Sequence, residues 1–213
     1  MSPADDLGFR HRYLPGAPGA GGVTLLLLHG TGGDESDLIP IGQSLAPGAA
    51  LLSPRGRVLE NGMPRFFRRL AEGVFDLQDL QVQTAAIAQF IAAASQKYSL
   101  QLNRMVAVGY SNGANIASSV LLSNPGLLTA AVLFRPMVPY VPQSRPNLRG
   151  LDILIAAGNR DPIASLGETK RLAGIFEAGG ATVSMHWHQG GHELGKDDLD
   201  AAAGWISQWR AAR

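Results

Sequence analysis

A chain of 213 residues has the size of one domain with a substantial hydrophobic core. Hydrophobic residues make up 46% of it, which excludes an intrinsically disordered protein, and the formal net charge of +1 argues against nucleic-acid or membrane-surface partners. The absence of cysteine excludes disulfides, zinc–thiolate sites and a cysteine nucleophile.

The first residues are acidic and lack the basic and apolar segments of a secretory signal. The apolar run at residues 23–28 is too short to cross a bilayer. We therefore expect a cytoplasmic protein without a membrane span.

Apolar runs that read as strands alternate with amphipathic segments along the chain. After an N-terminal segment and loop at residues 1–22, continuous apolar runs indicate strands covered on both faces. They lie at residues 23–28, 49–53, 105–108, 130–134 and 151–156. A more mixed run at residues 182–188 indicates an edge strand.

Helices are predicted where apolar residues recur at helical spacing. They lie around residues 82–91, 115–122, 172–176 and 198–210, with another capped by Ser36, and the proline-rich residues 136–150 read as a surface excursion. This alternation predicts one α/β domain over residues 1–213, a mostly parallel sheet with helices on both faces.

The segment that carries chemistry is Gly-Tyr-Ser-Asn-Gly at residues 109–113. Between a strand and a helix, Gly-x-Ser-x-Gly is typical of a nucleophile elbow, a sharp turn that raises the serine hydroxyl above the sheet. A serine that merely caps a helix is the alternative. The context favours Ser111 as a nucleophile.

A nucleophilic serine needs a base, and the histidines after Ser111 are His186, His188 and His192. The first two alternate within the predicted strand at residues 182–188, so we interpret them as structural. His192 follows a flexible Gln-Gly-Gly turn after that strand, where its ring can reach the serine. We predict His192 as the base.

The acid that orients this histidine is expected in the loop after the preceding strand. Asp161 lies there, at the carboxyl edge of the sheet that also carries Ser111 and His192. Asp152 is at the opposite end of its strand, and the aspartates near residue 198 suit helix capping. An Asp-Pro pair can also start a turn, but elimination favours Asp161.

A glycine-rich loop at residues 29–34 follows the first long strand. It predicts an oxyanion hole formed by the backbone N–H groups of Thr31 and of Asn112, the residue after the serine. A phosphate-binding loop is the alternative, but no Gly-Lys-Ser/Thr follows. His29 is expected to order the loop by hydrogen bonding.

Three further side chains are candidate substrate contacts. Phe66 and Phe67 could line an acyl pocket, with Arg68 and Arg69 gripping an anionic group. The alternative, which we favour for the arginines, is a surface helix that begins near Pro64 and carries them on its solvent side. Arg135, at the carboxyl end of a strand, could contact substrate, and a salt bridge to a loop carboxylate is the alternative.

These motifs resemble the phospholipase/carboxylesterase family of α/β-hydrolases over nearly the whole chain. The segments that carry the resemblance are residues 28–30, 109–113, 158–161 and 191–192. Residues 53–56, 60–69 and 134–139 look like a bacterial subgroup associated with hydroquinone-responsive operons. The resemblance implies an α/β-hydrolase fold without a lid domain, the same triad and a homodimer.

Thr31, Tyr110, Asn112 and Ala114 differ from the thioesterase branch, which argues against long-chain lipid or protein-acyl substrates. We expect a serine carboxylesterase for small or medium esters that needs no metal or cofactor. A thioesterase or lysophospholipase is the alternative within the family. A non-catalytic small-molecule-binding protein on the same fold is the alternative from another class.

Overall fold

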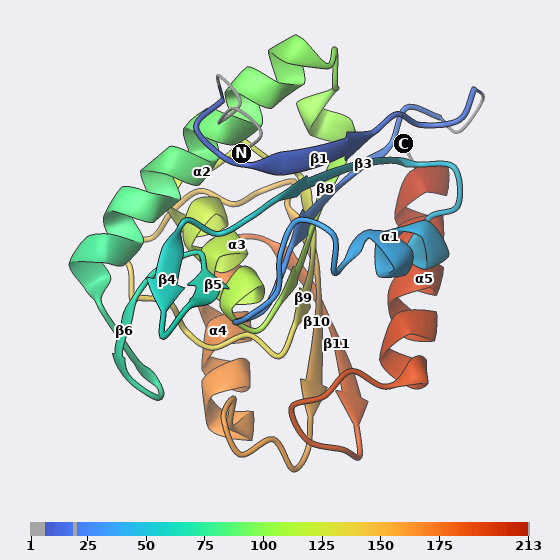
Figure 1. Cartoon of the computed structure of the whole chain (residues 1–213). Coiled ribbons are helices and arrows are strands. Elements are labelled where there is room, and N and C mark those ends of the chain that lie inside the picture. Colours follow the sequence, from blue (N-terminus) through green and yellow to red (C-terminus); the bar gives the residue numbers. More distant parts are fainter. Residues whose placement is uncertain (1–6, 19–20, 213) are drawn as a thin grey trace.

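The structure, a computed structural model, describes residues 7–18 and 21–212. Within these ranges seven strands form one sheet in the order β1-β3-β2-β8-β9-β10-β11 (Figure 1). They are β1 (His11–Leu14), β2 (Thr24–Leu28), β3 (Ala50–Pro54), β8 (Met105–Tyr110), β9 (Ala130–Phe134), β10 (Asp152–Gly158) and β11 (Thr182–His188). β1 is antiparallel to β3 and the other pairs are parallel, as predicted for the fold class.

Helices cover both faces of the sheet (Figure 1). One face carries α2 (Leu77–Lys97), α3 (Asn112–Ser123) and α4 (Leu166–Ala178), and the other carries α1 (Ile39–Leu45) and α5 (Lys196–Ala211). A 3-10 turn, Leu102–Arg104, precedes β8. None of the helices in the described ranges is long and apolar enough to span a membrane.

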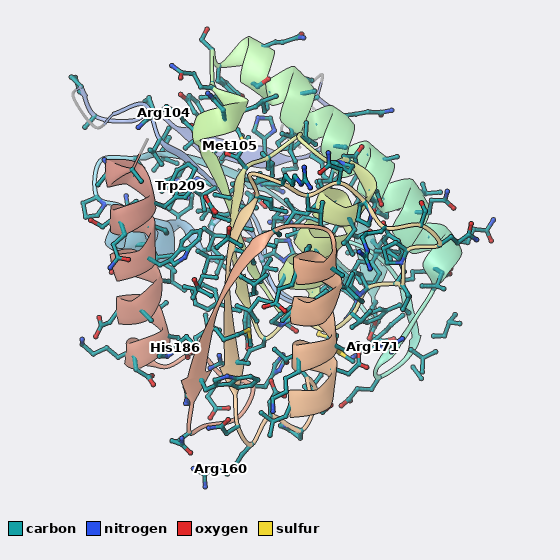
Figure 2. The ribbon with its side chains drawn as sticks, turned by 180° about the vertical axis from the view of Figure 1, so that it is seen from behind. Arg104, Met105, Arg160, Arg171, His186 and Trp209 are labelled. Carbon is teal, nitrogen blue, oxygen red and sulfur yellow. The ribbon has the colours of Figure 1, made fainter. Side chains whose placement is uncertain are left out.

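Most strands of the sheet are continuous apolar runs because helices bury both of its faces. Leu26 and Leu28 of β2 belong to the core that also contains residues of α2, α3 and α4, whereas Leu25 and Leu27 of the same strand belong to the core that contains residues of α1 and α5. Trp209 of α5 belongs to the second core, and Figure 2 shows it between that helix and the sheet. Since both faces are buried, the four positions of β2 after Thr24 are all leucine.

The segment between β3 and α2 differs from the prediction. Instead of a helix near Pro64 it forms two hairpins, β4 (Val58–Glu60) with β5 (Met63–Arg65), and β6 (Arg69–Ala71) with β7 (Val74–Phe75). Asn61 and Gly62 join β4 to β5 with φ of 52° and 81°. Two successive positive φ values fit a type I′ turn, for which Asn-Gly is the preferred sequence.

Two smaller differences concern element ends and an edge strand. Helix α1 begins at Ile39, after Leu38, and not at a Ser36 cap. The edge strand β1 was not predicted. The proline-rich residues 136–150 contain neither helix nor strand, as expected for an excursion between β9 and β10.

Two glycine-to-alanine substitutions are expected to change stability in opposite directions. Gly62→Ala meets no atom within 4 Å but must keep φ at 81°, so it should lower the free energy of unfolding by about 1 kcal/mol. Gly174→Ala in α4 also meets open space, at a helical position, and should raise it by roughly 0.5–1 kcal/mol. Urea denaturation of both variants checks this; two changes of the same sign would contradict the assigned turn.

Candidate active site

Ser111 lies in the sharp turn between β8 and α3. Its φ of 52° and ψ of −112° are outside the usual regions for a residue with a side chain, a strain of order 1–3 kcal/mol. A Cβ at Gly109 would lie 2.6 Å from Gly113 O, and one at Gly113 would lie 1.9 Å from Leu28 O. Glycine at both positions therefore allows the turn to bring the serine to the end of the sheet.

Three side chains from separate loops meet at this turn. His192 Nε2 lies 2.8 Å from Ser111 Oγ, and His192 Nδ1 lies 2.8 Å from Asp161 Oδ2. The other oxygen of Asp161 accepts hydrogen bonds from the N–H groups of Ile163 (2.8 Å) and Ala164 (2.9 Å). These two bonds orient the buried carboxylate toward the imidazole.

Five adjacent parallel strands supply the residues around Ser111. β2, β8, β9, β10 and β11 end at one edge of the sheet, the edge where ligands bind in open α/β folds. The residues that follow them are, in that order, Thr31, Ser111, Arg135, Asp161 and His192. Residues far apart in the sequence thus converge without any long loop.

Two backbone N–H groups lie beside the serine. Asn112 is the first residue of α3, and Thr31 follows β2. Neither N–H donates a hydrogen bond to another residue within the described ranges. Thr31 is fixed through its side chain, because Arg65 NH1 donates to Thr31 Oγ1 at 2.6 Å.

A cleft of about 200 Å³ opens in front of Ser111. Its wall includes Arg65, Arg69, Phe75, Tyr110, Asn112, Met137, Ile163 and His192, and none of the described lining residues carries a carboxylate. Asn112 Oδ1 accepts from Phe66 N at 2.7 Å, whereas Asn112 Nδ2 is buried without a partner within the described ranges. The wall therefore offers donors and positive charge to a ligand.

Two of the arginines that line the cleft, Arg65 and Arg69, share the carboxylate of Glu60. Arg69 binds Glu60 through Nε and NH2, at 2.9 and 2.7 Å, and Arg65 Nε lies 3.3 Å from Glu60. The hydrogen bond from Arg69 and the positive charges of both arginines keep the pKa of Glu60 below its ordinary value, against a smaller effect of burial. Two cations against one anion leave this wall with a net positive charge.

Phe66 and Phe67 do not line the cleft, so the prediction that they form its wall is wrong. They are 1% and 0% exposed and belong to the core beneath the hairpins. The apolar part of the wall comes from Phe75, Met137 and Ile163. No periodic pattern in the sequence marks these residues, because the hairpin that places Phe75 is too short to show one.

Arg135 was a candidate substrate contact, and the structure places its side chain elsewhere. It borders the cleft but is 0% exposed, and its guanidinium binds Asp198 at 3.0 and 2.6 Å. Burial raises the pKa of Asp198. The hydrogen bonds from Arg135 and from Gly195 N, together with the charge of Arg135, lower it by more, so the pKa of Asp198 lies below its ordinary value. The salt-bridge alternative is the correct one, with a helix carboxylate as partner.

Tyr110 is a further site residue that the sequence analysis did not single out. Its hydroxyl donates to His192 O at 3.1 Å, and its ring lies 5.6 Å from the His192 ring. Burial raises the pKa of Tyr110, which keeps the phenol protonated as a donor. Its place in Gly-x-Ser-x-Gly, next to Ser111, was the available signal.

His29 orders the loop that carries Thr31, as expected. Its Nε2 accepts from Gly56 N at 2.9 Å, so its Nδ1 carries the proton and donates to Gly30 O at 2.7 Å. The ring is buried, and this burial lowers the pKa of His29 below the ordinary value of 6.5.

Comparison with known proteins identifies the family of this chain. Residues 63–202 match the dienelactone hydrolase family. The chain belongs to this family. MhqD of Bacillus subtilis, named as a hydrolase, is 46% identical over 184 residues, which cover 86% of this chain and 92% of MhqD.

Two solved carboxylesterases share the fold over nearly their whole length. The Bacillus cereus enzyme is 45% identical with a TM-score of 0.91, covering 94% of each chain. The Mesorhizobium loti enzyme is 34% identical with a TM-score of 0.88, covering 95% of this chain and 96% of its own. This member of the dienelactone hydrolase family is therefore a hydrolase of the carboxylesterase type.

The burial of His29 predicts a specific pH dependence of stability. The pKa of His29 is lower in the folded protein than in the unfolded chain. Its contribution to the free energy of unfolding is therefore present above pH 6.5 and is lost as the pH falls below that value. One such group contributes a slope of at most about 1.4 kcal/mol per pH unit. We expect wild type to lose more free energy of unfolding between pH 7 and 5 than His29→Gln, measured by urea denaturation. Equal losses in the two proteins would contradict this assignment.

Proposed function

We propose that this chain is a serine carboxylesterase in which Ser111 is the nucleophile, His192 the general base and Asp161 the residue that orients the imidazole. The observation that carries the proposal is the pair of 2.8 Å contacts that join the three side chains in that order. The strained backbone of Ser111 supports it, because such strain concentrates at functional sites.

In the proposed first half-reaction His192 Nε2 removes the proton of Ser111 Oγ, which attacks the ester carbonyl. The N–H groups of Thr31 and Asn112 stabilise the tetrahedral oxyanion, a contribution of about 10²–10³ in turnover for one donor. The imidazolium then protonates the leaving alcohol, and an acyl-serine remains.

In the second half-reaction water attacks the acyl-serine. His192 accepts a proton from the water and returns it to Ser111 Oγ as the carboxylic acid leaves. Asp161 stabilises the imidazolium in both halves through Nδ1. The bonds of the Asp161 carboxylate to two backbone N–H groups help to hold the ring in this orientation.

The size of the cleft favours small or medium esters. About 200 Å³ is small compared with typical pockets for drug-sized ligands, which are roughly 300–1,000 Å³. A thioesterase or lysophospholipase remains the alternative within the fold, and a non-catalytic binding protein is the alternative from another class. The subgroup associated with hydroquinone-responsive operons, the cytoplasmic location and the homodimer stay predictions from the sequence.

The nucleophile is tested by labelling with a fluorophosphonate probe and by turnover of p-nitrophenyl esters from acetate to palmitate. We expect wild type to label and to prefer short chains, and Ser111→Ala to lose labelling and at least about 10⁴-fold in kcat. Ser118→Ala is the matched control, because this serine is buried in the same helix and bonds only within it. A folded wild-type protein that neither labels nor turns over any ester would favour the binding-protein alternative.

The net positive charge of the cleft predicts a preference for an anionic acyl group. We expect the p-nitrophenyl monoester of succinate to exceed p-nitrophenyl butyrate in kcat/KM by about fivefold at low salt, which corresponds to roughly 1 kcal/mol between charges a few ångströms apart in water.

Arg69→Gln should abolish this preference, because Arg69 lines the cleft. Arg68→Gln is the matched control, since that side chain is 62% exposed and binds Asp76 outside the cleft. A ratio that is the same in all three proteins and insensitive to salt would show that the arginines do not select the substrate.

A further inference from the structure

Arg135 is the largest fully buried side chain in the described ranges. It directly follows β9, and its backbone is left-handed, with φ of 54°. Its N–H donates to Ala156 O of β10 at 2.8 Å, which anchors this unusual conformation to the sheet. A bulky residue rarely adopts such a backbone unless its side chain has a role that depends on it.

The guanidinium reaches the loop that carries His192. Nε donates to Gly191 O at 3.1 Å and NH2 donates to Glu193 O at 2.8 Å. The carbonyl between them, that of His192, accepts from the Tyr110 hydroxyl at 3.1 Å. The carbonyls of residues 191–193 thus all accept hydrogen bonds, two of them from the guanidinium of Arg135.

Asp198 holds the guanidinium from the opposite side. Its side chain is 0% exposed, and it binds NH1 and NH2 of Arg135 and the N–H of Gly195. The bond to Gly195 ties α5 to the end of the same loop. The planar guanidinium can make all these bonds at once because its donors have a fixed geometry, which a lysine ammonium lacks.

His188 lies close to Asp197 and Asp198, and ligand atoms of these three residues are near enough to one another to hold a metal ion. The hydrogen bonds argue against this. His188 Nδ1 accepts from Gly190 N at 2.6 Å, so its Nε2, which faces Asp198 at 3.7 Å, carries the proton and has no lone pair for a metal. Both oxygens of Asp198 are already bound to Arg135.

We propose that Arg135 is a positioning residue that holds loop residues 189–195 so that His192 Nε2 stays within hydrogen-bond distance of Ser111 Oγ. The inference rests on the proposed role of His192 as base. A displacement of about 1 Å in a reacting group can lower a rate by about 10²-fold. The order of this loop therefore determines kcat, while substrate binding depends on other parts of the cleft.

The test uses Arg135→Lys and Arg135→Met in the full chain. Lysine keeps a cation opposite Asp198, so this variant should fold, but it cannot bind both carbonyls. We expect amide hydrogen exchange in residues 189–195 to become at least tenfold faster, and kcat to fall by roughly 10- to 100-fold with KM changed less than about threefold. Arg135→Met should show larger changes.

Thr84→Val is the matched control for lost stability. It removes a buried hydroxyl that bonds Leu80 O and Ser119 Oγ between α2 and α3, so Tm should fall while loop exchange and kcat stay unchanged. The inference is overturned if Arg135→Lys exchanges in the loop as slowly as wild type, or if Thr84→Val loses as much kcat at an equal loss of Tm.

The exchange measurement needs no activity, which separates this inference from the proposed function. If the wild-type protein hydrolyses no ester, the proposed function fails, and exchange still decides whether Arg135 orders the loop. If Arg135→Met does not fold, Arg135→Lys decides alone.

Discussion

The close approach of α3 to the end of β2 is the contact on which the geometry of the site depends. Gly113 lies so near the backbone of Leu28 that a Cβ would come within 1.9 Å of its carbonyl oxygen. Since Asn112 begins α3 and Thr31 follows β2, this contact brings these two residues to the same end of the sheet. The turn at Ser111, between β8 and α3, is held by Ser111 N to Phe134 O and by Asn115 N to Ser111 O, both at 2.9 Å. These bonds help to offset the strain at Ser111.

The loops of Asp161 and His192 are coupled in a similar way. A Cβ at Gly158 would lie 2.2 Å from Gly191 O, so the two loops pack backbone against backbone. Asn159 N donates to His188 O at 2.8 Å and Arg160 N donates to Gly190 O at 3.0 Å, as if the pairing of β10 and β11 continued past their ends. The loops that carry Asp161 and His192 therefore form one closely packed unit.

The sheet could be predicted from the sequence because most of its strands are buried on both faces and read as continuous apolar runs. The triad candidates could be predicted because the order of the residues along the chain and their places after strand ends leave few serines, acids and histidines to choose from. Ser111, Asp161 and His192 come together in the structure, and their catalytic roles remain a proposal. The hairpins could not be predicted from periodicity, since strands of two or three residues have none. Only Asn61-Gly62 marked the first of them. Phe66 and Phe67 follow the second strand of that hairpin, and both rings belong to the core.

The role of Arg135 could not be predicted from the residues around it in the sequence. Its partners are the carbonyls of Gly191 and Glu193 and the carboxylate of Asp198, all more than fifty residues away. A buried ion pair stabilises a fold little more than apolar residues of the same size, and often less. Of the described non-glycine residues with positive φ, Ser111 and Arg135 are the two at the carboxyl edge of the sheet, after the adjacent strands β8 and β9. At this edge of the sheet, a strained backbone and a buried charge thus hold Ser111 and the loop of His192 in place.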